Sequence, residues 1–259
     1  MAIDGPAAEL RDGSDAHPPT CAQVSGTGPA GEEGYDRIVA CLIPGYTSLA
    51  RLSVALLASS AQASPPGSTV LVAGCGSGTE LLEARHQRPD WLLTGLDPSA
   101  AMLDLAHRRL GNDATIRWHQ GTVESLGVEA GFDGALAVLV LQALPDDGSK
   151  LAFLSALARS LRPGGQLVLV DLMQPERSPL QDQLRQARLG FQQASGLASL
   201  EASVGSTGVT AETMQALTRG LHPIGLSRLT SLVAAAGFGD PAPVFQALDV
   251  EGFLLQRRS

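Results

Sequence analysis

Cysteine is scarce in this 259-residue sequence, which contains only Cys21, Cys41 and Cys75. They lie far apart and form no Cys-x-x-Cys pair, a spacing that argues against structural zinc and is typical of a reducing compartment. Long apolar runs are also missing, since no stretch reaches the roughly 20 residues that a membrane-spanning helix needs. The first residues lack the basic region and apolar core of a secretory signal. We therefore expect a cytoplasmic protein with no membrane partner and no metal site.

Basic residues are outnumbered, because 18 Lys and Arg face 26 Asp and Glu and the formal net charge is −8. A protein that neutralises many phosphates normally carries a basic face. The short basic cluster at residues 107–110 is typical of the solvated side of a helix. Direct binding of nucleic acid is therefore disfavoured. A homodimer is compatible with the sequence.

The chain is long enough for one open α/β domain with an extension, and 44% of its residues are hydrophobic. Residues 1–33 are rich in Gly, Pro, Ala and acidic residues without any period, which predicts a mobile tail. Residues 34–64 carry apolar side chains at helical spacing, interrupted at Pro44-Gly45, which predicts two helices. Residues 65–259 should form the α/β domain, with a helical cap inserted at 175–222.

Strand and helix patterns alternate after the first two helices. The expected strands cover residues 69–75, 91–97, 115–121, 132–144 and 166–173, and the expected helices cover 78–87, 98–111, 146–165 and 225–239, with two closing strands around 249–252. Pro98 should lie in the first turn of its helix and Gly111 near its end. Such alternation predicts a parallel sheet with helices on both faces.

The stretch VLVAGCGSGTELL, residues 70–82, runs from an apolar strand through three glycines into a helix. In an open α/β sheet, this position at the carboxyl end of a strand marks a nucleotide-sized site. The dinucleotide fingerprint needs a glycine where this chain has Thr79, and a phosphate-binding P-loop needs a lysine that the loop lacks. Asp97 closes the second strand, where an acid can accept both hydroxyls of a ribose. The pattern favours an adenosine that carries no phosphate.

Five segments resemble, in order and spacing, the motifs of class I S-adenosylmethionine-dependent methyltransferases. They are VLVAGCGSGTELL, LTGLDPSAAML, HQGTVESLG, FDGALAVLVLQALPD and LRPGGQLVLVDL. The resemblance covers residues 65–175, and the closing strands extend it to 258. It implies a doubly wound, seven-stranded, mostly parallel sheet of the Rossmann-like methyltransferase fold, with S-adenosyl-L-methionine as the cofactor.

The resemblance also implies roles for individual residues. The loop glycines would let the backbone pass under the methionine and ribose of the cofactor, Asp97 would bind the ribose, and Met102 would cover the adenine. Leu139 and Gln142 follow the fourth strand, where sulfonium and acceptor meet, and Asp171 is a candidate base at the end of the fifth. The expected cofactor contacts are Tyr46, Gly74, Cys75, Gly76, Gly78, Asp97, Pro98, Met102, Thr122, Val123 and Leu139, and the expected catalytic residues are Tyr46, Asp171 and Gln142.

This chain departs from the family pattern at two positions. Val72 stands where the family usually has an acid near the cofactor's amino group, and Thr122 stands where it usually has an aspartate at the adenine edge. The flanking segments IPGYTSLARL and GLSRLTSLVAAAGFGDPAPVFQALDVEGFLL resemble carboxy-S-adenosylmethionine synthases, whose Pro-Gly-Tyr helix makes Tyr46 a candidate contact. Those synthases carry a cap arginine, but this chain has none between Arg188 and Arg219.

Three functions are compatible with these residues. The first is a methyltransferase acting on a small, largely apolar or uncharged metabolite, because the segment 175–222 carries few charges. The second is an enzyme that uses the cofactor without methylation, either by cyclisation that releases methylthioadenosine or as a carboxy-S-adenosylmethionine synthase. The replacement at Val72 motivates it, since a neutral amine could attack the cofactor's own carbon chain. The third is a binding module without enzymatic activity.

Overall fold

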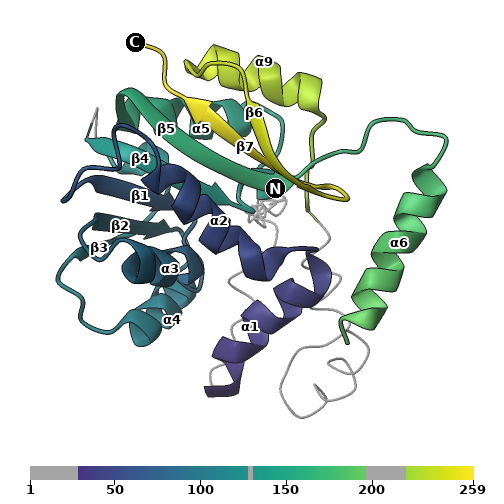
Figure 1. The fold of residues 1–259 in the computed structure, drawn as a ribbon, viewed down its shortest axis with the longest axis horizontal. Helices are drawn as coiled ribbons and strands as arrows, with labels where there is room; N and C mark the ends of the chain where they lie inside the picture. The colour runs from purple at the N-terminus through teal and green to yellow at the C-terminus, as the bar shows by residue number, and fades with distance from the viewer. Residues whose placement is uncertain (1–28, 128–130, 197–219) are drawn as a thin grey trace, which may run out of the picture.

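The computed structural model describes residues 29–127, 131–196 and 220–259 (Figure 1). The predicted seven-stranded, mostly parallel sheet is confirmed, with strand order β3-β2-β1-β4-β5-β7-β6. The five strands β3, β2, β1, β4 and β5 are parallel to their neighbours, whereas β7 runs antiparallel to both β5 and β6. The strands are β1 (Thr69–Ala73), β2 (Leu92–Asp97), β3 (Ile116–Gln120), β4 (Phe132–Val138), β5 (Leu161–Leu172), β6 (Ala242–Ala247) and β7 (Val250–Gln256).

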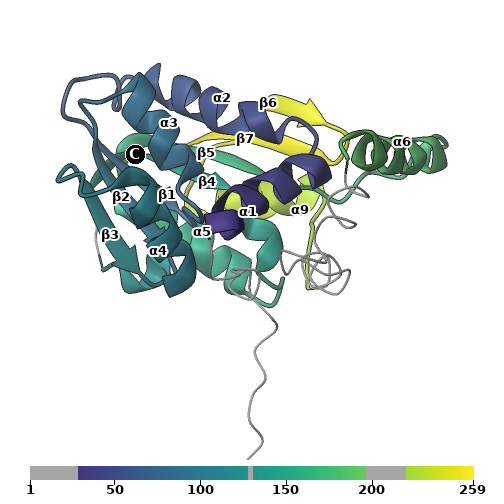
Figure 2. The same cartoon turned by 90° about the horizontal axis from the view of Figure 1, so that it is seen from below.

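Helices cover both faces of the sheet because the buried strands are apolar on both sides. In β1, Val70 and Val72 pack on the face covered by α2 (Tyr46–Ala58), α3 (Thr79–Gln87) and α4 (Ala100–Leu110). Leu71 and Ala73 alternate with them and pack toward α5 (Ser149–Ser160) and α9 (Leu226–Ala236). Figure 2 shows α2 and α5 on opposite sides of the sheet. Successive side chains of a strand point to opposite faces, so one apolar run serves two cores.

Two helices precede β1, as predicted, and meet at the turn Pro44-Gly45, where Gly45 has a φ of 82°. The first, α1 (Pro29–Leu42), begins inside the predicted tail, and residues 1–28 lie outside the described residues. No single described helix is long and apolar enough to cross a membrane. The helical segments 36–42 and 46–58 together have the length and apolar composition of a membrane span, but a bend of 96° separates them. Five residues of α2 are buried in the fold.

Several element boundaries differ from the sequence expectation. Helix α4 begins at Ala100, because the Ser99 side chain caps it by accepting a hydrogen bond from the Met102 N–H, so Pro98 lies before the helix rather than in its first turn. Helix α5 ends at Ser160, and the segment expected to be its last turn opens β5 instead. Pro163 lies in that segment, and proline lacks the N–H that a helix interior needs. The final strands turn at Leu248, with φ 57°, so β7 begins at Val250.

The segment between β5 and α9 contains one described helix, α6 (Gln181–Ala194), which stands away from the body in Figures 1 and 2. It reaches α1 through two polar contacts: Cys41 Sγ donates to the Ser195 carbonyl at 2.9 Å, and Gln192 Nε2 donates to the Leu42 carbonyl at 3.4 Å. Residues 197–219 of the predicted cap lie outside the described residues.

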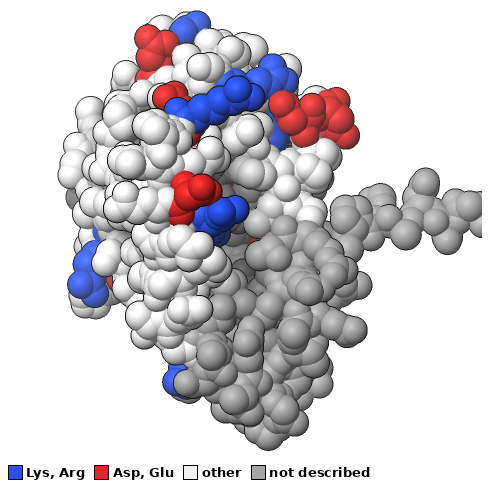
Figure 3. Space-filling view, turned by 90° about the vertical axis from the view of Figure 1, so that its right-hand side faces the viewer, with Lys and Arg blue, Asp and Glu red and all other residues white. Residues whose placement is uncertain are grey.

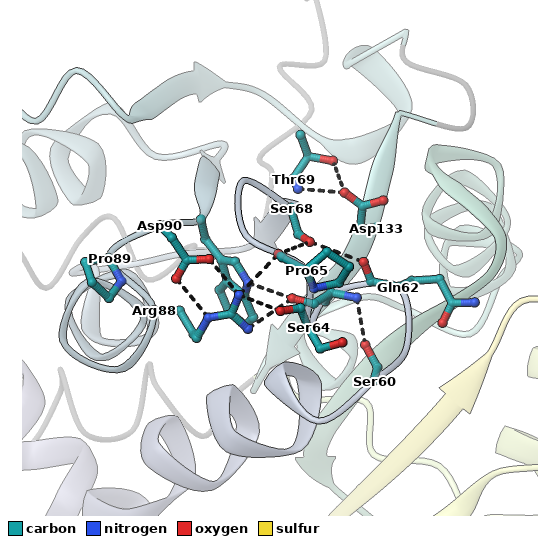
Figure 4. Close-up of polar contacts among 12 residues, drawn as sticks. Ser60, Gln62, Ser64, Pro65, Ser68, Thr69, Arg88, Pro89, Asp90 and Asp133 are labelled. Atoms are coloured by element: carbon teal, nitrogen blue, oxygen red, sulfur yellow. Dashed lines mark hydrogen bonds and ion pairs between the residues drawn. The ribbon is translucent and has the colours of Figure 1, made fainter.

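Arg88 fixes the linker that brings the chain from α2 into β1 (Figure 4). Its guanidinium donates to the carbonyls of Ala63, Ser64 and Pro65 at 3.0–3.2 Å and pairs with both oxygens of Asp90. The hydrogen bond from Arg88 lowers the pKa of Asp90 to about 2. One side chain thus satisfies three linker carbonyls and holds the start of the first strand.

We expect Arg88→Ala to lower the free energy of unfolding by about 2–3 kcal/mol, because the linker carbonyls lose their donor and Asp90 its counter-ion. Arg51→Ala is the matched control: its pair with Glu83 spans 3.8 Å and its side chain is 78% exposed. Such an exposed pair contributes about 0–1 kcal/mol. Equal losses for both variants in urea unfolding would contradict the role of Arg88.

Candidate active site

The glycine loop Gly74–Gly78 connects β1 to α3, and its three glycines have φ values of 68°, 50° and 86°. A Cβ added to Gly74 would meet Val140 Cγ2 at 2.5 Å, and one added to Gly78 would meet the Ala106 Cβ at 3.0 Å. At Gly76 nothing lies within 4 Å. Gly74 and Gly78 are therefore required by packing within the chain, while Gly76 leaves an open surface over the loop.

Asp97 joins the loop to the end of β2. Its Oδ2 accepts the Gly76 N–H at 2.9 Å and its Oδ1 accepts the Ser99 N–H at 2.9 Å. The side chain is buried, and this burial raises the pKa of Asp97 while the two N–H groups oppose the rise. A carboxylate oxygen can accept more than one hydrogen bond, so both oxygens keep capacity for hydroxyl donors.

Cys75 is 2% exposed and lies close enough to Asp97 and Glu80 for their charges to act on its thiol. Its N–H donates to the Leu96 carbonyl at 2.9 Å. Burial raises the pKa of the thiol, and the nearby charges of Asp97 and Glu80 raise it further. A thiol with a raised pKa stays protonated and is a poor nucleophile. The predicted contact of Cys75 with the cofactor would therefore be a packing contact.

The residues predicted for the adenine lie around the same sheet edge. The Gly121 N–H donates to the Asp97 carbonyl at 3.1 Å, which brings the end of β3 beside the end of β2. Met102 is buried in the first turn of α4, and Val123 is buried in the short helix that follows β3. Thr122 and Pro98 are exposed.

Asp171 and Gln142 lie where β4 and β5 end. Both oxygens of Asp171 are occupied: Oδ2 accepts the Leu141 N–H at 2.6 Å, and Oδ1 accepts the Gln142 and Leu172 N–H groups at 3.0 and 2.9 Å. Burial raises the pKa of Asp171 to about 7, against the effect of these donors and of Lys150. The arrangement favours a positioning role for Asp171 over the predicted role of a base.

Leu139 follows β4 with a φ of 59°, a conformation that is uncommon for a residue with a bulky side chain. Its N–H donates to the Val170 carbonyl at 2.7 Å, which holds the backbone in this state. Strained residues of this kind cluster at ligand sites. The position of Leu139, at the end of the strand next to β1, suits the predicted contact with the cofactor.

Asp36 of α1 binds the glycine loop and was missed by the sequence analysis. Its Oδ1 accepts hydrogen bonds from Ser77 Oγ at 2.7 Å and Tyr46 OH at 3.3 Å, and its Oδ2 accepts one from Arg109 at 2.8 Å. Tyr46 thereby contacts a residue that binds the loop, and its expected contact with the cofactor stays a prediction. The signal lay in the periodicity, because Asp36 shares its helix face with the buried Val39 and Ile43.

Glu80 is the second residue that the sequence analysis missed. It lies in the first turn of α3, directly after the loop, and is 8% exposed. Burial raises the pKa of Glu80 to about 7, with Asp36 raising it and Arg109 and its own backbone N–H lowering it. The sequence could have indicated its burial, because Glu80 precedes the buried Ala84 by one turn and so lies on the buried face of α3.

A surface depression of about 330 Å³ lies beside Gln142, whose carbonyl accepts the His222 N–H at 2.7 Å. Arg228 and Asp146 both line it and form an ion pair with two hydrogen bonds, each 2.9 Å long. No group of His, Cys, Asp and Glu side chains in the described ranges is arranged to hold a metal ion. Arg228 and Asp146, which line the depression, are thus engaged with each other.

Residues 70–165 match the family model of the methyltransferase domain. The chain is 45% identical over 98 residues to a trans-aconitate 2-methyltransferase of Methylobacterium nodulans, a match that covers 37% of this chain and 35% of that protein. It is 23% identical over 224 residues to a carboxy-S-adenosyl-L-methionine synthase of Campylobacter hominis, covering 86% and 90% of the two chains. Human N-acetylserotonin methyltransferase in complex with S-adenosylmethionine superposes with a TM-score of 0.55 at 14% identity, covering 89% and 59%.

Residues 70–165 therefore form a methyltransferase domain, and the similarity to S-adenosylmethionine-dependent enzymes implies S-adenosylmethionine as the cofactor. It spans about a third of the length of the trans-aconitate 2-methyltransferase that it matches. The site fits this cofactor, because the loop is open above Gly76 and Asp97 is held beside it with acceptor capacity to spare.

We expect Gly76→Ala to weaken binding of S-adenosylmethionine at least about ten-fold, since the new methyl group would occupy the open surface of the loop. Gly67→Ala is the control, because Gly67 has a φ of 77° and open space but lies before β1, at the opposite end of the strand. Both variants should lose about 1–2 kcal/mol of stability from left-handed strain. Equal cofactor affinity in both variants, measured by calorimetry, would contradict the role of Gly76.

We expect the free energy of unfolding of the cofactor-free protein to depend on Glu80 and pH. The folded pKa of about 7 exceeds the ordinary value of 4.5, so the folded chain holds a proton that the unfolded chain has released. Stability therefore falls as pH rises between these values, and the penalty is complete above pH 7. Glu80→Gln should raise the melting temperature more at pH 8 than at pH 5, whereas Glu83→Gln should show no such change. A pH-independent effect of Glu80→Gln would refute this assignment.

Proposed function

We propose that this protein is an S-adenosylmethionine-dependent methyltransferase that acts on a small metabolite. The observation that carries the proposal is the bond between the Gly76 N–H and Asp97 Oδ2 at 2.9 Å. It joins the open surface of the loop to a carboxylate suited to ribose hydroxyls. The partial match to methyltransferases supports the same conclusion.

The chain's own residues would bind and orient the reactants. Asp97 would hold the ribose, Met102 would cover the adenine, and the loop at Gly76 would carry the connecting part of the cofactor. When bound, the cofactor supplies a methyl group on a sulfonium, which is already a strong electrophile. Much of the rate of such a transfer can come from holding the nucleophile in line and excluding water.

No separate base is needed in this proposal. Asp171 has both carboxylate oxygens engaged by backbone N–H groups, and the Tyr46 hydroxyl contacts Asp36. Both residues are better suited to holding the site in shape. Asp171 supports the loop that carries Gln142, and Gln142 in turn accepts the Leu172 N–H through Oε1 at 3.2 Å.

A small, largely uncharged acceptor agrees with the charges on α6. Its three ionisable side chains are all paired, Arg185 with Asp182 at 2.9 Å and Arg188 with Asp249. Figure 3 shows that acidic and basic groups lie next to one another on the described part of this face. Of these two pairs only Arg188–Asp249 is partly buried, and an ionic acceptor that broke it would leave one of its charges without a counter-ion.

A second candidate function is a use of the cofactor without methylation. Val72, 2% exposed in the core, motivates it by removing the acid usually found near the cofactor's amino group. In cyclisation, a neutral amine would attack the carbon bonded to sulfur, the carbon–sulfur bond would break, and its electron pair would leave with methylthioadenosine. The similarity to carboxy-S-adenosylmethionine synthases belongs with this class of function.

The two functions are separated by incubating S-adenosylmethionine with the purified protein, without an acceptor, and following it by mass spectrometry. We expect the cofactor to stay intact over many hours, at the rate of a sample without protein. The Gly76→Ala variant is the control, because any conversion of the cofactor that occurs at this site should be weaker in a variant that binds the cofactor poorly. Accumulation of methylthioadenosine that depends on the protein would overturn the methyltransferase proposal.

A further inference from the structure

Two carboxyl groups besides Asp97 lie close to the glycine loop, and their surroundings differ. Asp36 is fully engaged by Arg109 and by the hydroxyls of Ser77, Thr79 and Tyr46. Glu80 forms no ion pair with any residue that the structure describes, although it is 8% exposed. A buried acid without a counter-ion is costly unless something else at the site balances its charge.

Glu80 follows the last glycine of the loop, Gly78, by two residues. It lies in the first turn of α3, and its charge acts on Cys75, as does the charge of Asp97. A cofactor whose ribose is bound by Asp97 would have Glu80 as the candidate acid for its amino-acid end. The cofactor's amino group is a cation, and at this end of the loop Val72 offers it no acceptor.

We propose that the Glu80 carboxylate binds the amino group of the cofactor, in place of the acid that Val72 replaces. This inference rests on the cofactor use proposed above and adds the residue that recognises its amino-acid end. An ammonium group would supply the missing counter-ion of Glu80. A carboxylate beside the amino group also keeps it protonated, so it has no lone pair for attack on the cofactor's own carbon chain.

The groups that face Glu80 are consistent with this assignment. They are Asp36 from α1, Arg109 from α4 and Cys75 from the loop. Arg109 is held by Asp36 and by the Ser77 carbonyl at 2.9 Å, so it is committed to the loop. The pKa of Glu80, about 7, means that the carboxylate form becomes dominant as pH rises from 6 to 8. Binding of an amino group should strengthen over the same interval.

The test compares two ligands by titration calorimetry on the full chain. S-adenosylhomocysteine carries the amino acid, whereas 5′-methylthioadenosine has the same adenosine and thioether without it. We expect Glu80→Gln to weaken S-adenosylhomocysteine about 10- to 100-fold, as the loss of a charge-assisted hydrogen bond requires, and to change methylthioadenosine less than about two-fold. Glu83→Gln, one turn further along α3, should change neither.

The pH arm uses the same proteins. The affinity of the unaltered protein for S-adenosylhomocysteine should rise between pH 6 and pH 8, and that of Glu80→Gln should stay level. Equal effects of Glu80→Gln on both ligands, or none on either, would overturn the role of Glu80 and leave the proposed function standing. If the unaltered protein binds neither ligand nor S-adenosylmethionine, the proposed function and this inference both fall.

Discussion

The bond between Asp97 and the Gly76 N–H is the constraint on which the site depends. Parallel strands bring the ends of β1 and β2 to one edge of the sheet, but the loop after β1 could adopt many paths. The carboxylate selects one by accepting the Gly76 N–H at 2.9 Å, and its other oxygen accepts the N–H of Ser99, which caps α4. One side chain thereby sets the path of the loop and the start of a helix, and it presents its carboxylate at the position proposed for the ribose.

The same loop also positions the helix that precedes the sheet. Asp36 ties α1 to Ser77 and to Arg109 of α4, so the N-terminal helices are attached to the site rather than only to the core. Each of these carboxylates is satisfied in a different way: Asp97 by backbone N–H groups and Asp36 by a cation and hydroxyls. Glu80 differs because it forms no ion pair with any residue in the described ranges, and the one cation that acts on it, Arg109, is bound by Asp36. A site that leaves one buried acid unpaired is prepared for a cationic group.

The strands and helices of the sheet could be predicted because apolar runs and glycine stops are local signals. The boundaries at Pro98 and Pro163 could not, since a serine cap and a strand pairing compete with helical periodicity there. The glycines and Asp97 were visible because the loop imposes their residue types. The role of Asp171 depends on three backbone N–H groups. One belongs to the next residue, Leu172, and two belong to Leu141 and Gln142 in a different segment, so no sequence pattern could reveal the arrangement.

Val72 and Glu80 together bear on which chemistry the cofactor can undergo. An apolar residue at position 72 alone would leave the amino group free to lose its proton, which is the condition that cyclisation needs. A carboxylate at Glu80 reverses this, because it favours the charged form of the amine and removes its lone pair. Under this proposal, Glu80 of α3 holds the cofactor's amino group in its charged form although Val72 has replaced the acid usually found in β1. In the proposed assignment, the charge comes from α3 instead of β1, and the proposed reaction is methyl transfer to a second molecule.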